Sequence, residues 1–190
     1  MVARPRRRRV ILLVLLAAAI LGTDVPSRGN DEATGRLSEY KIKAAYLYYF
    51  ATFVTWPSDG TPQAPAGLVI GILGDDPFGP ILEETVRGKM VNNQPLTVRK
   101  YQNIKDARQS AILYISSSEK DNLAHIFNSL DGAAVLTVGE TDDFASRGGQ
   151  IGFTTQDKQV RFEINATAVK RAGLKVSAQL MKLGKLVEER

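Results

Sequence analysis

Acidic side chains follow three apolar segments of the sequence, at the points where we expect β-strands to end. These residues are Asp75, Asp76, Glu119, Asp142 and Asp143. Because the carboxyl ends of parallel strands meet at one edge of a sheet, we expect the five residues to form an acidic rim at that edge. Carboxylates in such a rim could bind a cationic ligand or a divalent cation. The alternative is that they are ordinary capping residues, since Asp and Ser often accept hydrogen bonds from the first amides of a helix.

No residue of the chain is predicted to be catalytic. The chain has a single histidine, His125, and no cysteine, so a thiol nucleophile and a zinc site of the Cys/His type are both excluded. On its predicted helix, His125 lies about 160° from the apolar face, toward solvent. The glycines of GILGDDPFG lack the spacing of a dinucleotide-binding loop, and no P-loop pattern occurs. We therefore expect a protein that is not an enzyme and that holds no metal ion and no cofactor.

The first 22 residues have the pattern of an export signal. The basic stretch MVARPRRRR precedes an apolar run from Val10 to Leu21. A run of about 12 residues suits a secretory signal peptide and is shorter than the roughly 20 residues that span a membrane. Residues 1–22 are predicted to be a signal peptide, or alternatively a short uncleaved anchor. Residues 23–36 are polar and predicted to be a flexible tether, and residues 37–190 are predicted to form a single domain.

The charge of the whole chain is misleading about its partners. The formal net charge is +5 and the isoelectric point is near 9.5. Five of the basic residues are arginines of the leader, and without them the basic and acidic residues are equal in number. The predicted domain therefore has no basic excess that would attract nucleic acid. With no cysteine, it also has no disulfide and no thiol switch.

The segment from Leu37 to Trp56 is predicted to be an aromatic helix that ends at Pro57. At 100° per residue, one face carries Ile42, Ala45, Tyr46, Tyr49, Phe50, Phe53 and Trp56. Small residues form a second face, consisting of Ala44, Ala51 and Thr55. Because both faces are apolar, we expect the helix to be buried on two sides. The alternative is that its last turns, with Tyr49, Phe53 and Trp56, bind a partner protein.

The rest of the domain alternates between predicted strands and helices. Continuous apolar strands are predicted at Leu68–Leu73, Leu96–Tyr101, Ala111–Ser116 and Ala133–Val138, with helices after the first and at Glu119–Leu130. Gly149–Thr155 and Lys158–Asn165 alternate in polarity and are predicted to form a hairpin at the sheet edge. Asn165 is placed to cap the first of two closing helices, Ala166–Ala172 and Ser177–Glu188. The predicted fold class is α/β, with a mostly parallel central sheet covered by helices on both faces and an edge hairpin.

Taken together and in order, several segments resemble the YfiR family. They are EYKIKAAYLYYFATFVTWP, VIGILGDDPFG, AILYIS, AAVLTVGE, GGQIGF, VRFEIN and AGLKVSAQLMKLGKLV, which run from about Glu39 to Val187. None of these motifs is specific alone, whereas the combination FxxFVTWP, GDDPFG, LTVG and FEINxxA is.

The resemblance implies a periplasmic regulatory protein with an α/β fold. It implies repression of an inner-membrane diguanylate cyclase similar to YfiN, through the periplasmic part of that enzyme. It also implies release by an outer-membrane lipoprotein similar to YfiB, lower cyclic di-GMP and less biofilm in the repressed state, and a possible homodimer. Members of the name-giving system carry disulfides linked to redox control, which this cysteine-free chain cannot form.

Three hypotheses of function follow from the sequence. The first is a periplasmic repressor of a membrane diguanylate cyclase, without catalytic residues of its own. The second is a small-ligand sensor that uses the acidic rim and feeds another membrane signalling system. The third is a hydrolase with a cation held by the four aspartates of the rim, and it is the least favoured because no nucleophile or base accompanies them.

Overall fold

The computed structural model describes residues 28–57 and 67–190. The predicted signal peptide, residues 23–27 of the predicted tether and the stretch 58–66 lie outside the described residues. Within the described ranges, no helix is both long enough and apolar enough to cross a membrane.

An eight-stranded sheet forms the centre of the domain, in the order β10-β8-β7-β6-β5-β2-β4-β3. In chain order its strands are β2 (Leu68–Leu73), β3 (Met90–Val91), β4 (Gln94–Tyr101), β5 (Ile112–Ile115), β6 (Leu136–Gly139), β7 (Ile151–Gln156), β8 (Gln159–Asn165) and β10 (Lys185–Val187). Five consecutive strands of the sheet are parallel to one another, namely β4, β2, β5, β6 and β7. The β7–β8 pair is the predicted antiparallel hairpin. The mostly parallel α/β sheet expected from the sequence is thereby confirmed.

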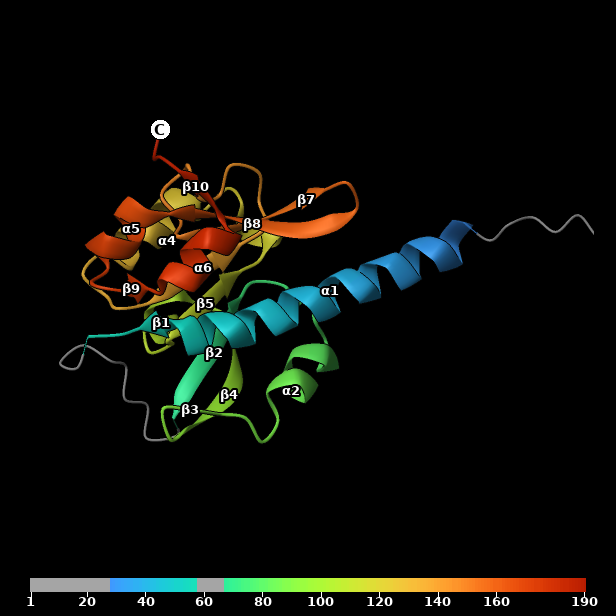
Figure 1. Ribbon diagram of the computed structural model, residues 1–190, viewed down its shortest axis with the longest axis horizontal. Helices are drawn as coiled ribbons and strands as arrows, with labels where there is room; N and C mark the ends of the chain where they lie inside the picture. The colour runs from blue at the N-terminus through green and yellow to red at the C-terminus, as the bar shows by residue number, and fades with distance from the viewer. Residues whose placement is uncertain (1–27, 58–66) are drawn as a thin grey trace, which may run out of the picture.

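Helices cover both faces of this sheet because successive strand residues point to opposite sides. On β5, Ile112 and Tyr114 join one hydrophobic cluster, and Leu113 and Ile115 join the other. The first cluster packs under α1 (Arg28–Phe53), α2 (Pro80–Val86), α5 (Ala166–Arg171) and α6 (Ala178–Leu183). The second packs under α3 (Ile104–Ala107) and α4 (Leu123–Ser129), which follows the short 3-10 helix η1 (Ser117–Glu119). Figure 1 shows α1 crossing the sheet and extending beyond it.

Helix α1 differs from its prediction at both ends and in its orientation. It begins at Arg28, so residues 28–36 of the predicted tether are helical, and it ends at Phe53. Val54 and Thr55 form strand β1, which pairs with β9 (Lys175–Val176) in a separate two-stranded sheet. Helix α1 is buried through a set that includes Ala44, Leu47, Phe50, Ala51 and, just beyond its end, Val54. The predicted core face is therefore correct only in part. Phe50 and Trp56 are buried as predicted, whereas Ile42 and Tyr49 are 43% and 50% exposed, so the buried side is rotated toward Ala44, Leu47 and Ala51.

The end of the domain is also different from its prediction. The helix expected at Ser177–Glu188 stops at Leu183, and the next residues form strand β10. Strand β10 pairs in parallel with β8, opposite Glu163, Ile164 and Asn165. The hairpin is therefore one strand in from the sheet edge. Only glycine fits at position 184, between α6 and β10, because a Cβ atom there would lie 2.6 Å from Phe162 and 2.7 Å from Ile164, which is too close for a side chain.

Candidate functional site

A buried lysine lies at the centre of the most strongly charged site described in the domain. Lys43 projects from α1 beneath the carboxyl end of the sheet and is only 3% exposed. Its Nζ pairs with Glu39 Oε1 at 2.6 Å, one helical turn away, and with Glu140 Oε2 in the loop after β6. Burying an ammonium group is costly unless carboxylates pair with it. The two glutamates therefore compensate the buried ammonium of Lys43.

Two tyrosines complete this charged centre. Tyr40 donates a hydrogen bond to Glu140 Oε1 at 3.0 Å. Burial raises the pKa of Tyr40, and the nearby negative charge of Glu140 raises it further. Burial also raises the pKa of Tyr114, and the carboxylate of Glu140 beside its hydroxyl raises it further. The ring of Phe78 packs edge-on against both tyrosines, 5.3 Å from Tyr40 and 4.8 Å from Tyr114 between centroids.

A cavity of about 600 Å³ opens beside the charged centre. It lies between α1, the loop after β6 and the β7–β8 hairpin, and its charged lining consists of Glu39, Lys43, Glu140, Asp142, Asp143 and Glu163. Lys43 faces five carboxylates in this lining, and two of them are paired with further cations, Glu163 with Lys185 and Asp143 with Arg190. The five negative charges therefore exceed the three positive ones by two, which leaves the cavity with a negative potential. The ring of Phe153, 5.9 Å from Lys43 Nζ, adds an aromatic surface. Chemically, this cavity favours a cation.

The structure divides the predicted acidic rim into two parts. Asp142 and Asp143 line the cavity. Asp76 instead stabilises the turn before α2, because its Oδ1 accepts hydrogen bonds from the amides of Phe78 at 2.8 Å and Gly79 at 3.3 Å, while its Oδ2 pairs with Lys100 at 2.7 Å.

The remaining two residues of the rim lie near η1, outside the cavity lining. Asp75 is exposed, and its amide donates to Ser118 Oγ at 3.0 Å. Glu119 accepts a hydrogen bond from Asn122. In the described part of the chain, no three carboxylate or histidine side chains are grouped closely enough to bind a metal ion. Local hydrogen bonding thus accounts for the part of the rim that lies outside the cavity.

The three residues predicted to bind a partner, Tyr49, Phe53 and Trp56, lie in different environments. Trp56 is buried in the core with 8% of its surface exposed, and its Nε1 donates a hydrogen bond to the carbonyl of Ala111 at 3.1 Å. Tyr49 remains half-exposed, and Phe53, partly buried, stacks on it with 6.3 Å between ring centroids. The ring of Tyr48 lies 5.7 Å from that of Tyr49. An aromatic surface therefore remains on α1, without its tryptophan.

The central residues of the site, Lys43 and Tyr40, were not identified from the sequence. A pattern could have pointed to Lys43, because it lies four residues before Leu47 and seven before Phe50, on the side of α1 that is buried. A lysine at a buried position requires a carboxylate partner. One such partner, Glu39, lies four residues earlier on the same helix, but only the fold shows that the other is Glu140, 97 positions away in the chain.

The fold and this site define an α/β domain with a charged centre beside an open cavity. The sequence profile of the YfiR/HmsC-like family matches residues 40–185, and the chain belongs to this family. It is a family of periplasmic regulatory proteins that act through partners.

Similarity outside the family profile is slight. None of the curated proteins is similar enough in sequence to count as a match. One solved structure, of a conserved domain protein from Vibrio cholerae O1 biovar El Tor strain N16961, aligns with a TM-score of 0.48 and 11% identity. That alignment covers 65% of this chain and 55% of the Vibrio chain.

Proposed function

We propose that this protein is exported to the periplasm and represses an inner-membrane diguanylate cyclase by binding its periplasmic part. Release would come from a second partner, such as an outer-membrane lipoprotein that sequesters the repressor. Repression would lower cyclic di-GMP and biofilm formation. Family membership supports the regulatory class, and the uncovered face of α1 is the observation that supports binding of a protein partner.

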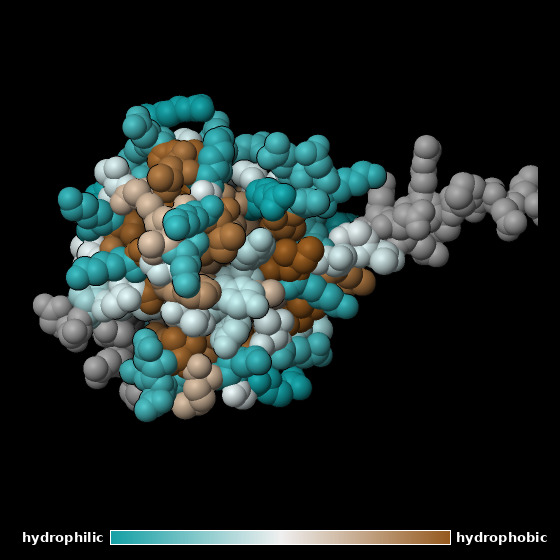
Figure 2. Space-filling view, in the orientation of Figure 1, coloured by the Kyte–Doolittle hydropathy of each residue, from teal (hydrophilic) through white to brown (hydrophobic). Residues whose placement is uncertain are grey.

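That face is unusual for a helix of a folded domain. Ile42, Tyr49 and Phe53 lie on one side of α1, spaced by seven and four residues. Ile42 and Tyr49 are about half-exposed, and Phe53 is partly so. Exposed apolar and aromatic residues that line up on one surface often mark a protein interface. On the face that Figure 2 shows, hydrophobic side chains also reach the surface in separate patches between polar ones.

The acidic cavity lies beside the same helix and supports the proposal from its charge. Glu39 and Lys43, which line the cavity, are on α1, four residues apart. A partner that covers the aromatic face of α1 could therefore also reach the cavity rim. Basic side chains of such a partner would be steered toward the five carboxylates.

A pull-down from membranes of the host tests the proposal. The tagged mature domain is cross-linked to membranes, and the captured proteins are identified by mass spectrometry. We expect an inner-membrane diguanylate cyclase, and we expect cyclic di-GMP to rise when the gene is deleted. Capture of a different membrane sensor, with cyclic di-GMP unchanged, would refute repression of a cyclase and keep only the regulatory class.

A pair of variants locates the interface. Tyr49→Glu should abolish capture of the cyclase without lowering the melting temperature, because the side chain is 50% exposed. Met90→Glu is the matched control, since Met90 is 56% exposed on β3 at the opposite edge of the sheet from β10. If Tyr49→Glu captures the cyclase as well as Met90→Glu does, this face of α1 is not the interface.

The cavity supports a second candidate, a sensor of a small cationic ligand. Its five carboxylates and aromatic wall fit an organic amine. Binding to the folded state would raise the melting temperature in proportion to the logarithm of ligand concentration above its dissociation constant. A titration with putrescine, followed by the melting temperature, tests this candidate. If putrescine raises the melting temperature of Asp142→Asn/Asp143→Asn as much as that of the wild type, the cavity is not its binding site.

A further inference from the structure

A second pocket, on the other face of the sheet, has a different chemistry. It has a volume of about 400 Å³ and lies between α4, the start of β6, the start of β7 and α5. Phe127, Leu130 and Val135 supply its apolar part, and Gln150, Arg171 and Glu189 supply most of its polar part. Pockets that bind small molecules commonly have about 300–1,000 Å³ and combine an apolar lining with a few fixed polar groups.

The buried amide of Gln150 has a fixed orientation in this pocket. Gln150 is only 6% exposed. Its Oε1 accepts two hydrogen bonds from Thr137, one from the backbone amide and one from Oγ1 at 2.9 Å. A backbone amide can only donate, so the oxygen of Gln150 must face Thr137, and the nitrogen must face the other way.

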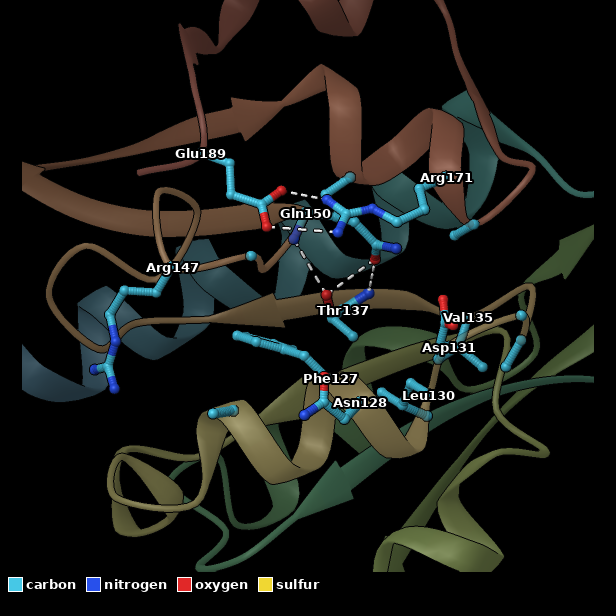
Figure 3. A pocket seen from close by; sticks show the side chains of 16 residues that line it. Phe127, Asn128, Leu130, Asp131, Val135, Thr137, Arg147, Gln150, Arg171 and Glu189 are labelled. Carbon is cyan, nitrogen blue, oxygen red and sulfur yellow. Dashed lines mark hydrogen bonds and ion pairs between the residues drawn. The ribbon is translucent and has the colours of Figure 1, made fainter.

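The nitrogen of Gln150 is consequently a donor without an acceptor on a buried side chain. No described residue accepts a hydrogen bond from Gln150 Nε2, although Gln150 lines the pocket. Figure 3 shows this nitrogen on the side of the amide opposite Thr137. This nitrogen reaches the solvent of the pocket, so a ligand that carries a hydrogen-bond acceptor can replace the water there.

Arg171 provides a second donor on the same side of the pocket, and it already holds a carboxylate. Its guanidinium pairs with Glu189, with Nη1–Oε1 at 3.4 Å and a close Nη2–Oε2 contact. Both side chains are partly exposed, at 50% and 36%, and exposed ion pairs add little net stability. Glu189 can therefore be displaced by another carboxylate at little cost.

We propose that this pocket binds a small organic carboxylate with an apolar or aromatic body. The carboxylate takes the place of Glu189 on Arg171 and accepts a hydrogen bond from Gln150 Nε2. The body lies against Phe127 and Leu130, which face these polar groups across the pocket in the close-up view (Figure 3). Glu189 acts as an internal competitor for the site.

The proposal is tested on the full mature chain with benzoate as the probe and benzamide as its uncharged analogue, by calorimetry or ligand-detected NMR. We expect Glu189→Gln to bind benzoate about fivefold more tightly than the wild type, as expected when a weak competing ion pair is removed. Glu188→Gln is the matched control, because it removes the same charge from the adjacent exposed residue and should leave benzoate affinity unchanged. Benzamide should gain nothing from Glu189→Gln.

Gln150→Glu tests the buried donor itself. One oxygen of the new side chain can still accept from Thr137, while the other turns a negative acceptor toward the ligand. We expect at least about tenfold weaker benzoate binding, the usual loss for one charge-assisted hydrogen bond. If this variant does not fold, Arg171→Gln gives the same test at a partly exposed side chain. Absence of saturable benzoate binding in both the wild type and Glu189→Gln would overturn the proposal, as would equal binding of benzoate and benzamide.

Discussion

Lys43 is the residue whose environment is most demanding. Its ammonium is buried against Glu39 and Glu140, and the side chain of Glu140 is itself only 14% exposed. Replacing one partner of a buried ion pair strands the other without compensation, whereas replacing both is often nearly neutral. The charged centre therefore acts as a unit that fixes α1 on the loop after β6.

We expect Lys43→Met to lower the free energy of unfolding by about 3 kcal/mol, because Glu140 remains buried without its ammonium partner. Urea unfolding followed by the fluorescence of Trp56, the only tryptophan, gives this value. The control Lys185→Met removes a lysine that pairs with Glu163 but is 75% exposed, so its loss should stay below about 1 kcal/mol. Equal losses in the two variants would contradict the prediction, and Lys43→Met/Glu140→Gln should recover part of the stability.

Tyr114 carries the second prediction at this scale. Its hydroxyl is buried beside Glu140, and burial together with that carboxylate raises its pKa. The raised pKa means that the folded state keeps the proton while the unfolded state loses it above pH about 10. The contribution of Tyr114 to stability is thus constant below that pH and falls as the pH rises above it, by up to about 1.4 kcal/mol per unit.

Tyr114→Phe should remove this alkaline loss. At neutral pH we expect a change within about 1 kcal/mol, because a buried hydroxyl is no longer desolvated while its interaction with Glu140 is lost. The measurement is the free energy of unfolding between about pH 9 and pH 11.5 in both proteins. Parallel pH profiles would show that Tyr114 does not contribute to the alkaline loss.

At the scale of elements, β10 depends on one glycine. Gly184 lies where β8 leaves no room for a Cβ atom, with Phe162 at 2.6 Å and Ile164 at 2.7 Å. Gly184→Ala should therefore destabilise the domain by about 1–3 kcal/mol through overpacking. Amide hydrogen exchange should show the largest loss of protection at β10 and β8.

Gly35→Ala is the control for that variant. Gly35 lies within α1, and a Cβ atom added there would meet no other atom within 4 Å. Removing a helical glycine without steric conflict should leave stability unchanged or raise it by up to about 1 kcal/mol. A similar destabilisation by both alanines would point to backbone effects and not to the β10–β8 contact.

At the scale of the whole molecule, one sheet joins two hydrophobic clusters. Phe50 belongs to the cluster under α1, and Phe144 to the cluster under α4. Because the same strands contribute to both clusters, neither can be lost without the other. We expect Phe50→Ala and Phe144→Ala each to cost about 3–5 kcal/mol and each to unfold in one transition. Trp56 fluorescence and far-UV circular dichroism should give coincident curves, and separate transitions in Phe144→Ala would show that the α4 layer unfolds alone.

Local patterns predicted much of this architecture. The bounds of β2 agree with the predicted strand Leu68–Leu73, since a continuous apolar run with β-branched residues suits a strand buried on both faces. Asn165 caps α5 as expected, with its Oδ1 accepting from the amide of Ala168 at 2.9 Å. The β7–β8 hairpin agrees with the alternation of its two segments. His125 is exposed, as its helical position predicts.

The rotation of α1 was not predictable from its own residues. An apolar face identifies the buried side of a helix only when the opposite side is polar. In α1, Ile42 and Tyr49 are as apolar as the residues that are buried, and the one lysine on the buried side was a misleading sign. Strand β10, with three residues, is likewise too short to be recognised by its pattern.

The sequence by itself determined the longer strands and helices, the α/β class and the family, because these depend on periodicity and on motifs within short segments. The tertiary structure alone decided which carboxylate meets Lys43, which part of the acidic rim lines a cavity, and that Gln150 turns an unpaired donor into a pocket. These features join residues far apart in the chain, as Lys43 and Glu140 are. Their positions follow from packing and strand order, which no single segment encodes.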